Sequence, residues 1–248
     1  MSQIFTILFY QPILNLLIFL YNTISFQDLG IAIILLTVVI KLVFWPLGRT
    51  AIKSQKALQD LQPKIEELKK RHADNKAELS RATMDLYKEN KVNPFSSCLP
   101  LLIQLPFLLA VYRVFTNSIN NQLELTYSFI SRPTIINTLS LGFLDLAHPS
   151  VYLAVLAGLA QFLQAKMMIN KPAVNAIKGA EDNMAAIMNK QMLYFMPALT
   201  IFIGISLPGG LTLYWLVLTL LTALQQGLTF KKNSGSKAAG VIDGEIVS

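Results

Sequence analysis

Acidic residues are absent from the long hydrophobic runs of this 248-residue chain, although it contains 14 Asp and Glu in all. Proton pumps and ion-coupled transporters usually carry carboxylates within the membrane, so this absence argues against that class of protein. The single cysteine, Cys98, excludes an internal disulfide, and no His or Cys cluster surrounds it to form a metal site. Phosphate-binding glycine loops, HExxH motifs and nucleophile–histidine pairs are also missing. The sequence therefore predicts neither an enzyme nor a bound cofactor.

Hydrophobic sequence is what the chain does contain. Hydrophobic residues make up 53% and charged residues 14% of it, and its mean hydropathy is +0.49, which is typical of polytopic membrane proteins. About 20 apolar residues cross a bilayer, and about 17 are the lower limit. We predict an all-α polytopic membrane protein, and five runs meet this length: 29–48, 95–115, 151–168, 191–207 and 211–230. Only a tight turn fits between the last two runs, which predicts a helical hairpin there.

Basic residues gather on one side of these predicted spans. Residues 51–93 hold ten Lys and Arg, residues 165–190 hold four, and the segment after residue 230 holds three, which makes 17 of the 21 in the chain. The first 28 residues hold none, and the loop 116–150 holds only Arg132. Because cytoplasmic loops are enriched in Lys and Arg, we predict a plasma-membrane protein with its N-terminus outside and its C-terminus in the cytoplasm.

The N-terminal region, residues 1–28, allows two interpretations. The apolar run 4–20 is nearly long enough to span, but Gln11, Asn15 and Asn22 share a narrow polar stripe, and Pro12 would kink a spanning helix. We favour an interfacial helix on the outer surface, with a sixth span as the alternative.

A cytoplasmic hairpin is predicted over residues 51–93. Apolar residues recur every three or four positions on either side of a break at 73–75: Leu58, Leu61, Ile65 and Leu68 before it, and Leu79, Ala82 and Leu86 after it. This pattern favours two antiparallel amphipathic helices over a solvated charged loop. The net charge of +3 suits an acidic partner surface or anionic lipid headgroups. The tail 231–248 has no periodic pattern and is predicted to be disordered.

Lys41 is the candidate for a functional residue within the membrane. It lies in the first predicted span, where a cation without a carboxylate must either snorkel to an interface or stand in a hydrated cavity. Uncharged polar residues in the other spans, including Gln104, Gln161 and Gln164, favour a cavity that opens to the cytoplasm. On general grounds, Trp215 is typical of an interfacial aromatic belt.

Several short blocks of the sequence resemble one known family. They are TVVIKLVFWPL at 37–47, SQKALQDLQPK at 54–64, LYKE at 86–89, VNP at 92–94, CLPLLIQLP at 98–106, FLDL at 143–146, QFLQ at 161–164 and GLTLYW at 210–215. In this order they resemble the YidC/Oxa/Alb family of membrane protein insertases, over almost the whole chain. The chain looks like the short forms, which lack a large extracytoplasmic domain.

This resemblance implies a core, here residues 29–230, of five helices around a hydrophilic groove that is open to the cytoplasm and the lipid. It implies that Lys41, and not Arg49, is the groove cation. The family usually has Arg at this place, and Lys lacks the planar fork of donors. Gln104 and Trp215 match groove positions, and Gln161 or Gln164 would supply a contact from the third span.

By resemblance, the chain inserts membrane proteins and helps them fold, alone or with the Sec translocon, and without a cofactor. Its expected partners are nascent membrane proteins and the lipid bilayer, with ribosomes and targeting factors at the hairpin 51–93 and the basic tail. No specific recognition of nucleic acid is expected. Two alternatives from other classes are a small-solute channel or transporter that uses the same cavity, and an assembly factor that only shields substrate helices.

Overall fold

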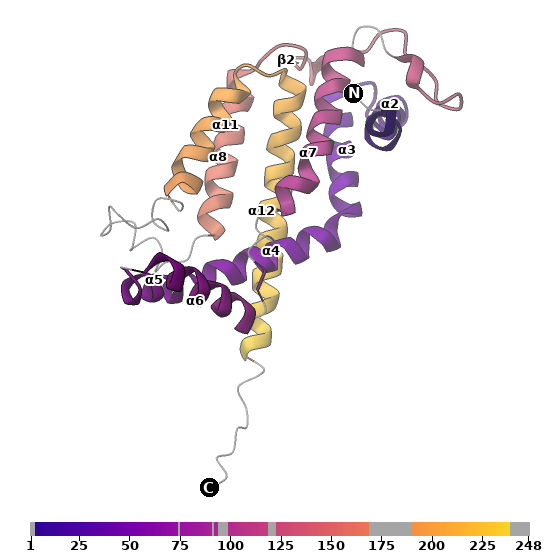
Figure 1. Ribbon diagram of the computed structural model, residues 1–248. Helices are drawn as coiled ribbons and strands as arrows, with labels where there is room; N and C mark the ends of the chain where they lie inside the picture. The colour runs from indigo at the N-terminus through magenta and orange to yellow at the C-terminus, as the bar shows by residue number, and fades with distance from the viewer. Residues whose placement is uncertain are drawn as a thin grey trace.

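The computed structural model describes residues 3–73, 75–90, 92–93, 99–118, 123–168 and 190–238, and these are mostly helical (Figure 1). Cys98 and the start of the second predicted run lie outside them. The helices are α1 Gln3–Phe5, η1 Thr6–Tyr10, α2 Gln11–Thr23, α3 Leu29–Val43, α4 Trp45–Asp60, α5 Gln62–Arg71, α6 Lys76–Glu89, α7 Leu99–Arg113, η3 Val114–Ser118, η4 Leu123–Leu125, α8 Val151–Met168, η5 Gln191–Phe195, α11 Met196–Gly204 and α12 Gly209–Ala238. Strands β1 Leu139–Ser140 and β2 Leu144–Asp145 pair antiparallel.

The first predicted span is shorter than the sequence indicated. It was expected to continue to residue 48, but α3 ends at Val43, and the helical stretch that begins at Trp45 leaves at an angle of 71°. Pro46 lies in the first turn of α4. Proline has no amide hydrogen to donate to the preceding turn, and its ring crowds that turn, so a continuous helix through this point is unfavourable.

Length and composition identify fewer certain spans than the five predicted. Among the described residues, three helical stretches are long and apolar enough to cross a membrane, Gln3–Thr23, Val151–Met168 and Gly209–Phe230, and a fourth if the bent pair of α3 with α4 and α5 is one span. Apolar helices over Gln104–Thr116 and Gln191–Gly204 are shorter. The five-span arrangement therefore stays a prediction.

Helix α8 is the common partner of α11 and α12. Gly158 of α8 faces α11 so closely that a Cβ there would lie 2.4 Å from the Ile201 side chain. The last two predicted spans were expected to form a helical hairpin, but α11 and α12 both pack mainly on α8. Helix α12 also continues to Ala238, beyond the predicted start of a disordered tail at residue 231; extending an existing helix costs much less than starting one.

The N-terminal helix α2 crosses the other helices, and Figure 1 shows it end-on beside the long axes of α3 and α7. Its predicted polar stripe faces protein. Asn15 donates to the Leu125 carbonyl at 3.1 Å and accepts from the Tyr127 amide at 2.7 Å, and Asn22 donates to the Ser131 carbonyl at 2.7 Å. The stripe thus holds the loop between η4 and β1, which the sequence did not indicate.

Asp28 joins this same side of the molecule to α3. Its side chain accepts from the Ile31 amide at 3.0 Å and caps α3, and it also accepts from the Ser140 hydroxyl at 2.6 Å and the Leu141 amide at 2.7 Å. Burial by itself would raise the pKa of this carboxyl, but the hydrogen bonds from Leu141, Ser140 and Ile31 outweigh it, so the pKa is lowered.

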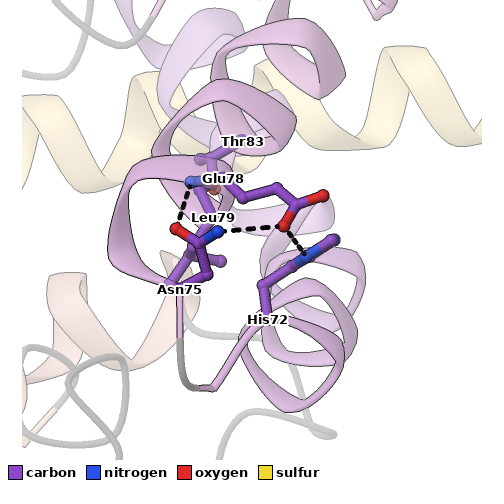
Figure 2. Close-up of polar contacts among 5 residues, drawn as sticks. All are labelled: His72, Asn75, Glu78, Leu79 and Thr83. Carbon is purple, nitrogen blue, oxygen red and sulfur yellow. Dashed lines mark hydrogen bonds and ion pairs between the residues drawn. The ribbon is translucent and has the colours of Figure 1, made fainter.

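Helices α5 and α6 pack side by side and are joined by a turn that is capped by side chains (Figure 2). Asn75 accepts from the Glu78 amide at 3.2 Å and caps α6, and its own side-chain amide donates to the Glu78 carboxylate at 3.2 Å. His72 approaches the same carboxylate at 3.5 Å. Leu61 and Ile65, from the predicted apolar stripe, are buried.

We predict that Asp28→Asn destabilises the protein by roughly 1–3 kcal/mol, because the introduced NH₂ group would face a backbone donor that needs an acceptor. Because the pKa of Asp28 is lowered in the folded state, its contribution is present above the ordinary value of 3.8 and is lost as the pH falls through the folded value. Thermal unfolding in detergent over a pH series measures both effects. Asp85→Asn, in an exposed pair with Lys88, is the control, and equal effects of the two variants would contradict the prediction.

Candidate functional site

A cavity of about 360 Å³ lies where the bend between α3 and α4 meets α7, α8 and α12. Apolar side chains such as Ile40, Phe107 and Leu218 form part of its wall. Of the residues that the structure describes, nine polar ones also line it: Lys41, Gln55, Gln104, Gln161, Gln164, Thr219, Thr222, Gln225 and Gln226. The described lining is therefore rich in amides and holds one cation, in a space built between apolar helices.

Lys41 points into this cavity and contacts α12. Its ammonium donates to the Thr222 hydroxyl at 2.8 Å, and that hydroxyl donates in turn to the Leu218 carbonyl at 2.7 Å. Within the described part of the chain, no carboxylate lies within ion-pair distance of Lys41. The residue stands in the last turn of α3, where the carbonyl end of the helix dipole favours a positive charge. This geometry favours the cavity over snorkelling.

Three glutamines that the sequence singled out also line the cavity. Gln104 of α7 donates to the Tyr214 hydroxyl of α12 at 2.5 Å, and Tyr214 is fully buried. Gln161 of α8 accepts a hydrogen bond from Thr200 of α11. Gln164, one turn further along α8, also lines the cavity, and it makes no such bond within the described residues.

Trp215 does not line the cavity, in contrast to the other four predicted residues. Counting by three and four residues along α12 places Trp215, Thr219, Thr222 and Gln226 on one stripe of the helix. Trp215 is the first of them and lies one turn beyond the cavity, toward the start of α12. The same spacing could have identified Thr219 and Thr222 from the sequence. They were missed because threonine is an ordinary residue in an apolar run.

Gln225 fastens the bend of α3 and α4 to α12. It is fully buried, and its side chain donates to the Trp45 carbonyl at 2.8 Å. Gly48 eases this approach, because a Cβ at that position would lie only 3.0 Å from the side-chain oxygen of Gln225. Within the described residues, the side-chain amide oxygens (Oε1) of Gln225 and Gln226 have no hydrogen-bond partner, although both are buried.

The chemistry of this site is that of binding. Amides and hydroxyls hydrogen-bond polar groups, and one ammonium attracts an anion. In the part of the chain that the structure describes, no group of three His, Cys, Asp or Glu could hold a metal ion. Fold and cavity together define a class: a helical membrane protein with a polar, positively charged cavity among its apolar helices.

Comparison with known proteins identifies the family within this class. The family model described as "60Kd inner membrane protein" matches residues 19–237. A protein named membrane protein insertase YidC from Fusobacterium nucleatum is 35% identical over 229 residues, which cover 91% of this chain and 98% of that protein. Proteins of the same name from Syntrophus aciditrophicus and Magnetococcus marinus are 38% and 36% identical, over 87% and 90% of this chain.

The chain belongs to this inner membrane protein family, which confirms the resemblance to YidC and its relatives. It spans nearly the whole length of the Fusobacterium relative but only 35% of the length of the other two.

Gln104 and Tyr214 form a pair whose two ends differ in access to the cavity. We predict that Gln104→Leu costs roughly 1–3 kcal/mol, because it leaves the buried Tyr214 hydroxyl without this partner. Tyr214→Phe should cost less, roughly 0.5–1.5 kcal/mol, because water in the cavity can serve the Gln104 amide instead. Unfolding of both variants and of the double variant in detergent measures the two costs and their coupling. A larger cost for Tyr214→Phe would contradict this asymmetry.

Proposed function

We propose that this protein is a membrane protein insertase, which also helps its substrates to fold. The observation that carries the proposal is the Lys41 ammonium, held in a polar cavity between apolar helices with a hydroxyl as its partner. The names of the relatives that match almost the whole chain support the same function.

The cavity would act by lowering the local free-energy barrier that a polar segment meets when it crosses the bilayer. A charged side chain at the centre of a bilayer costs several kcal/mol, and the polar lining offers it hydrogen bonds in place of water. Lys41 would receive the acidic or polar part of a substrate while the apolar part moves into the lipid. Gln104, Gln161 and Gln164 would hold the polar segment, and Trp215, one turn away along α12, would contact the apolar segment.

For orientation, we propose five spans: α3, α7, α8, α11 with η5, and α12, with the cavity open to the cytoplasm. Lys41 stands in the last turn of α3, so the cavity lies toward the end that leads into the basic segment 51–93. In this orientation the α5–α6 hairpin and the C-terminus would lie in the cytoplasm, in agreement with the distribution of positive charge. The crossing direction of α2 in Figure 1 supports an interfacial N-terminal helix on the outer side.

The proposed partners follow from these surfaces. Nascent membrane proteins would enter the cavity, and the lipid bilayer would surround the helices. Ribosomes and targeting factors would bind the α5–α6 hairpin and the basic tail, where positive charge predominates. The protein would act alone or beside the Sec translocon.

A small-solute channel or transporter is the competing proposal, since a glutamine-lined cavity of about 360 Å³ could also hold a small molecule. Purified protein in liposomes separates the two functions. Solute flux without crosslinks from Gln104 to a stalled nascent chain would support the channel, whereas membrane-inserted substrate would support the insertase.

We predict that Lys41→Ala slows insertion of substrates with acidic outer tails at least fivefold in such liposomes. The expected loss is on the order of 1 kcal/mol, the attraction of two charges about 4 Å apart in a hydrated site. Substrates that differ only in a neutral tail should be affected much less. Lys41→Arg keeps the charge and should retain the preference.

Arg49→Ala is the matched control, because it removes a nearby cation that does not line the cavity. It should leave the ratio of acidic to neutral substrates unchanged. Equal slowing of both substrates by Lys41→Ala would exclude the electrostatic part of the proposal and leave the insertase activity itself standing.

A further inference from the structure

Three large apolar side chains stand exposed around the start of α3. Phe26 is 95% exposed, Phe143 is 77% exposed and Leu141 is 66% exposed. Phe26 precedes the capping residue of α3 by two positions, while Leu141 and Phe143 belong to the turn between β1 and β2. We call these three residues the apolar tip.

Hydrogen bonds fix the apolar tip to the membrane helix. Asp28 binds the Leu141 amide at 2.7 Å and the Ser140 hydroxyl at 2.6 Å while it caps α3. The turn itself is closed by the Phe143 amide, which donates to the Ser140 carbonyl at 3.2 Å. The exposed side chains are therefore presented from an ordered backbone.

The backbone of the tip also carries strain. Phe26 and Leu141 have φ angles of 54° and 53°, in the left-handed region, and so has Gln27 at 61°. This conformation costs an L-residue about 1–2 kcal/mol, and non-glycine residues that adopt it often have a functional reason. Exposure of two phenylalanines to water adds a further cost that burial in an apolar medium would remove.

We infer that the apolar tip inserts into the boundary between headgroups and acyl chains of the bilayer leaflet at the N-terminal end of α3. Two observations identify lipid as the occupant. The tip is continuous with a membrane helix, because Asp28 caps α3 and β1 packs against it. The segment 139–144 carries no charge, and the two carboxylates beside it already have partners: Asp28 accepts from three donors, and Asp145 is bonded to His148 at 2.6 Å.

This anchor would set the depth of Lys41 in the bilayer. From the start of α3 to Lys41 the helix rises about 18 Å at 1.5 Å per residue. The hydrocarbon core is about 30 Å thick, so a tip at its outer boundary would place the Lys41 backbone just past the midplane. The meaning of this depth for substrates rests on the proposed function, whereas insertion of the tip does not.

Nitroxide labels measure the insertion directly. In a Cys98→Ala background, Phe143→Cys would be labelled in the purified full chain, which is then reconstituted in phosphatidylethanolamine and phosphatidylglycerol vesicles. Collision of the label with oxygen, which concentrates in lipid, is compared with collision with a water-soluble nickel chelate. Lys88→Cys, whose side chain is 74% exposed on α6, is the reference for water. Leu220→Cys, 51% exposed on α12, is the reference for lipid.

The label at Phe143 should resemble the one at Leu220, with oxygen collisions exceeding those of the nickel chelate. Nickel access equal to that at Lys88 would overturn the inference. Dipolar broadening that vanishes when labelled protein is diluted with unlabelled protein would also overturn it, because a second copy of the chain would then cover the tip. Assays of substrate insertion on the same vesicles measure the insertase function separately. A tip that does not enter the lipid can therefore be distinguished from a protein that does not insert substrates.

Discussion

A lysine in an apolar helix needs a polar partner or water, and much of this structure depends on how Lys41 obtains one. The ammonium reaches across to Thr222 on α12, which in turn holds the Leu218 carbonyl. Because α3 ends two residues after Lys41 and bends at Phe44, the cation also lies at the carbonyl end of a helix. The cavity is thus the space that the bend opens and that the glutamines of α7, α8 and α12 make polar.

The walls of the cavity are held by contacts of two kinds. Glycine allows close packing between helices, as at Gly158 against Ile201 and Pro197 of α11 and at Gly48 against the Gln225 side chain of α12. Buried polar pairs then fix the helices in register, as Gln104 does with Tyr214 and Gln225 with the Trp45 carbonyl. In lipid, where apolar surface drives helix association only weakly, small residues and interhelical hydrogen bonds are the usual determinants of packing.

The sequence predicted the α-helical class, the bounds of α8, and four of the cavity residues, because these depend on local apolar runs and on the rarity of polar groups within them. It missed the end of α3 at Val43, because the apolar run continues past this residue. Pro46 did not reveal the break, since proline is also tolerated in the first turn of a helix. It missed the partners of Asn15 and Asn22 because their contacts are more than 100 residues away in the chain. It assigned Trp215 to the groove by resemblance, but Trp215 does not line the cavity. Which side of α12 a residue faces depends on how the helices pack, and the sequence does not show this.

The bond between Gln225 and the Trp45 carbonyl has a mechanical consequence. Helices α4 and α5 are separated only by Leu61, and backbone hydrogen bonds continue through it, so the pair acts as an arm with the α5–α6 hairpin at its far end. A pull on that hairpin would be transmitted along the arm to the bond at Trp45 and hence to the wall of the cavity. The start of the arm and the wall of the cavity therefore share one hydrogen bond.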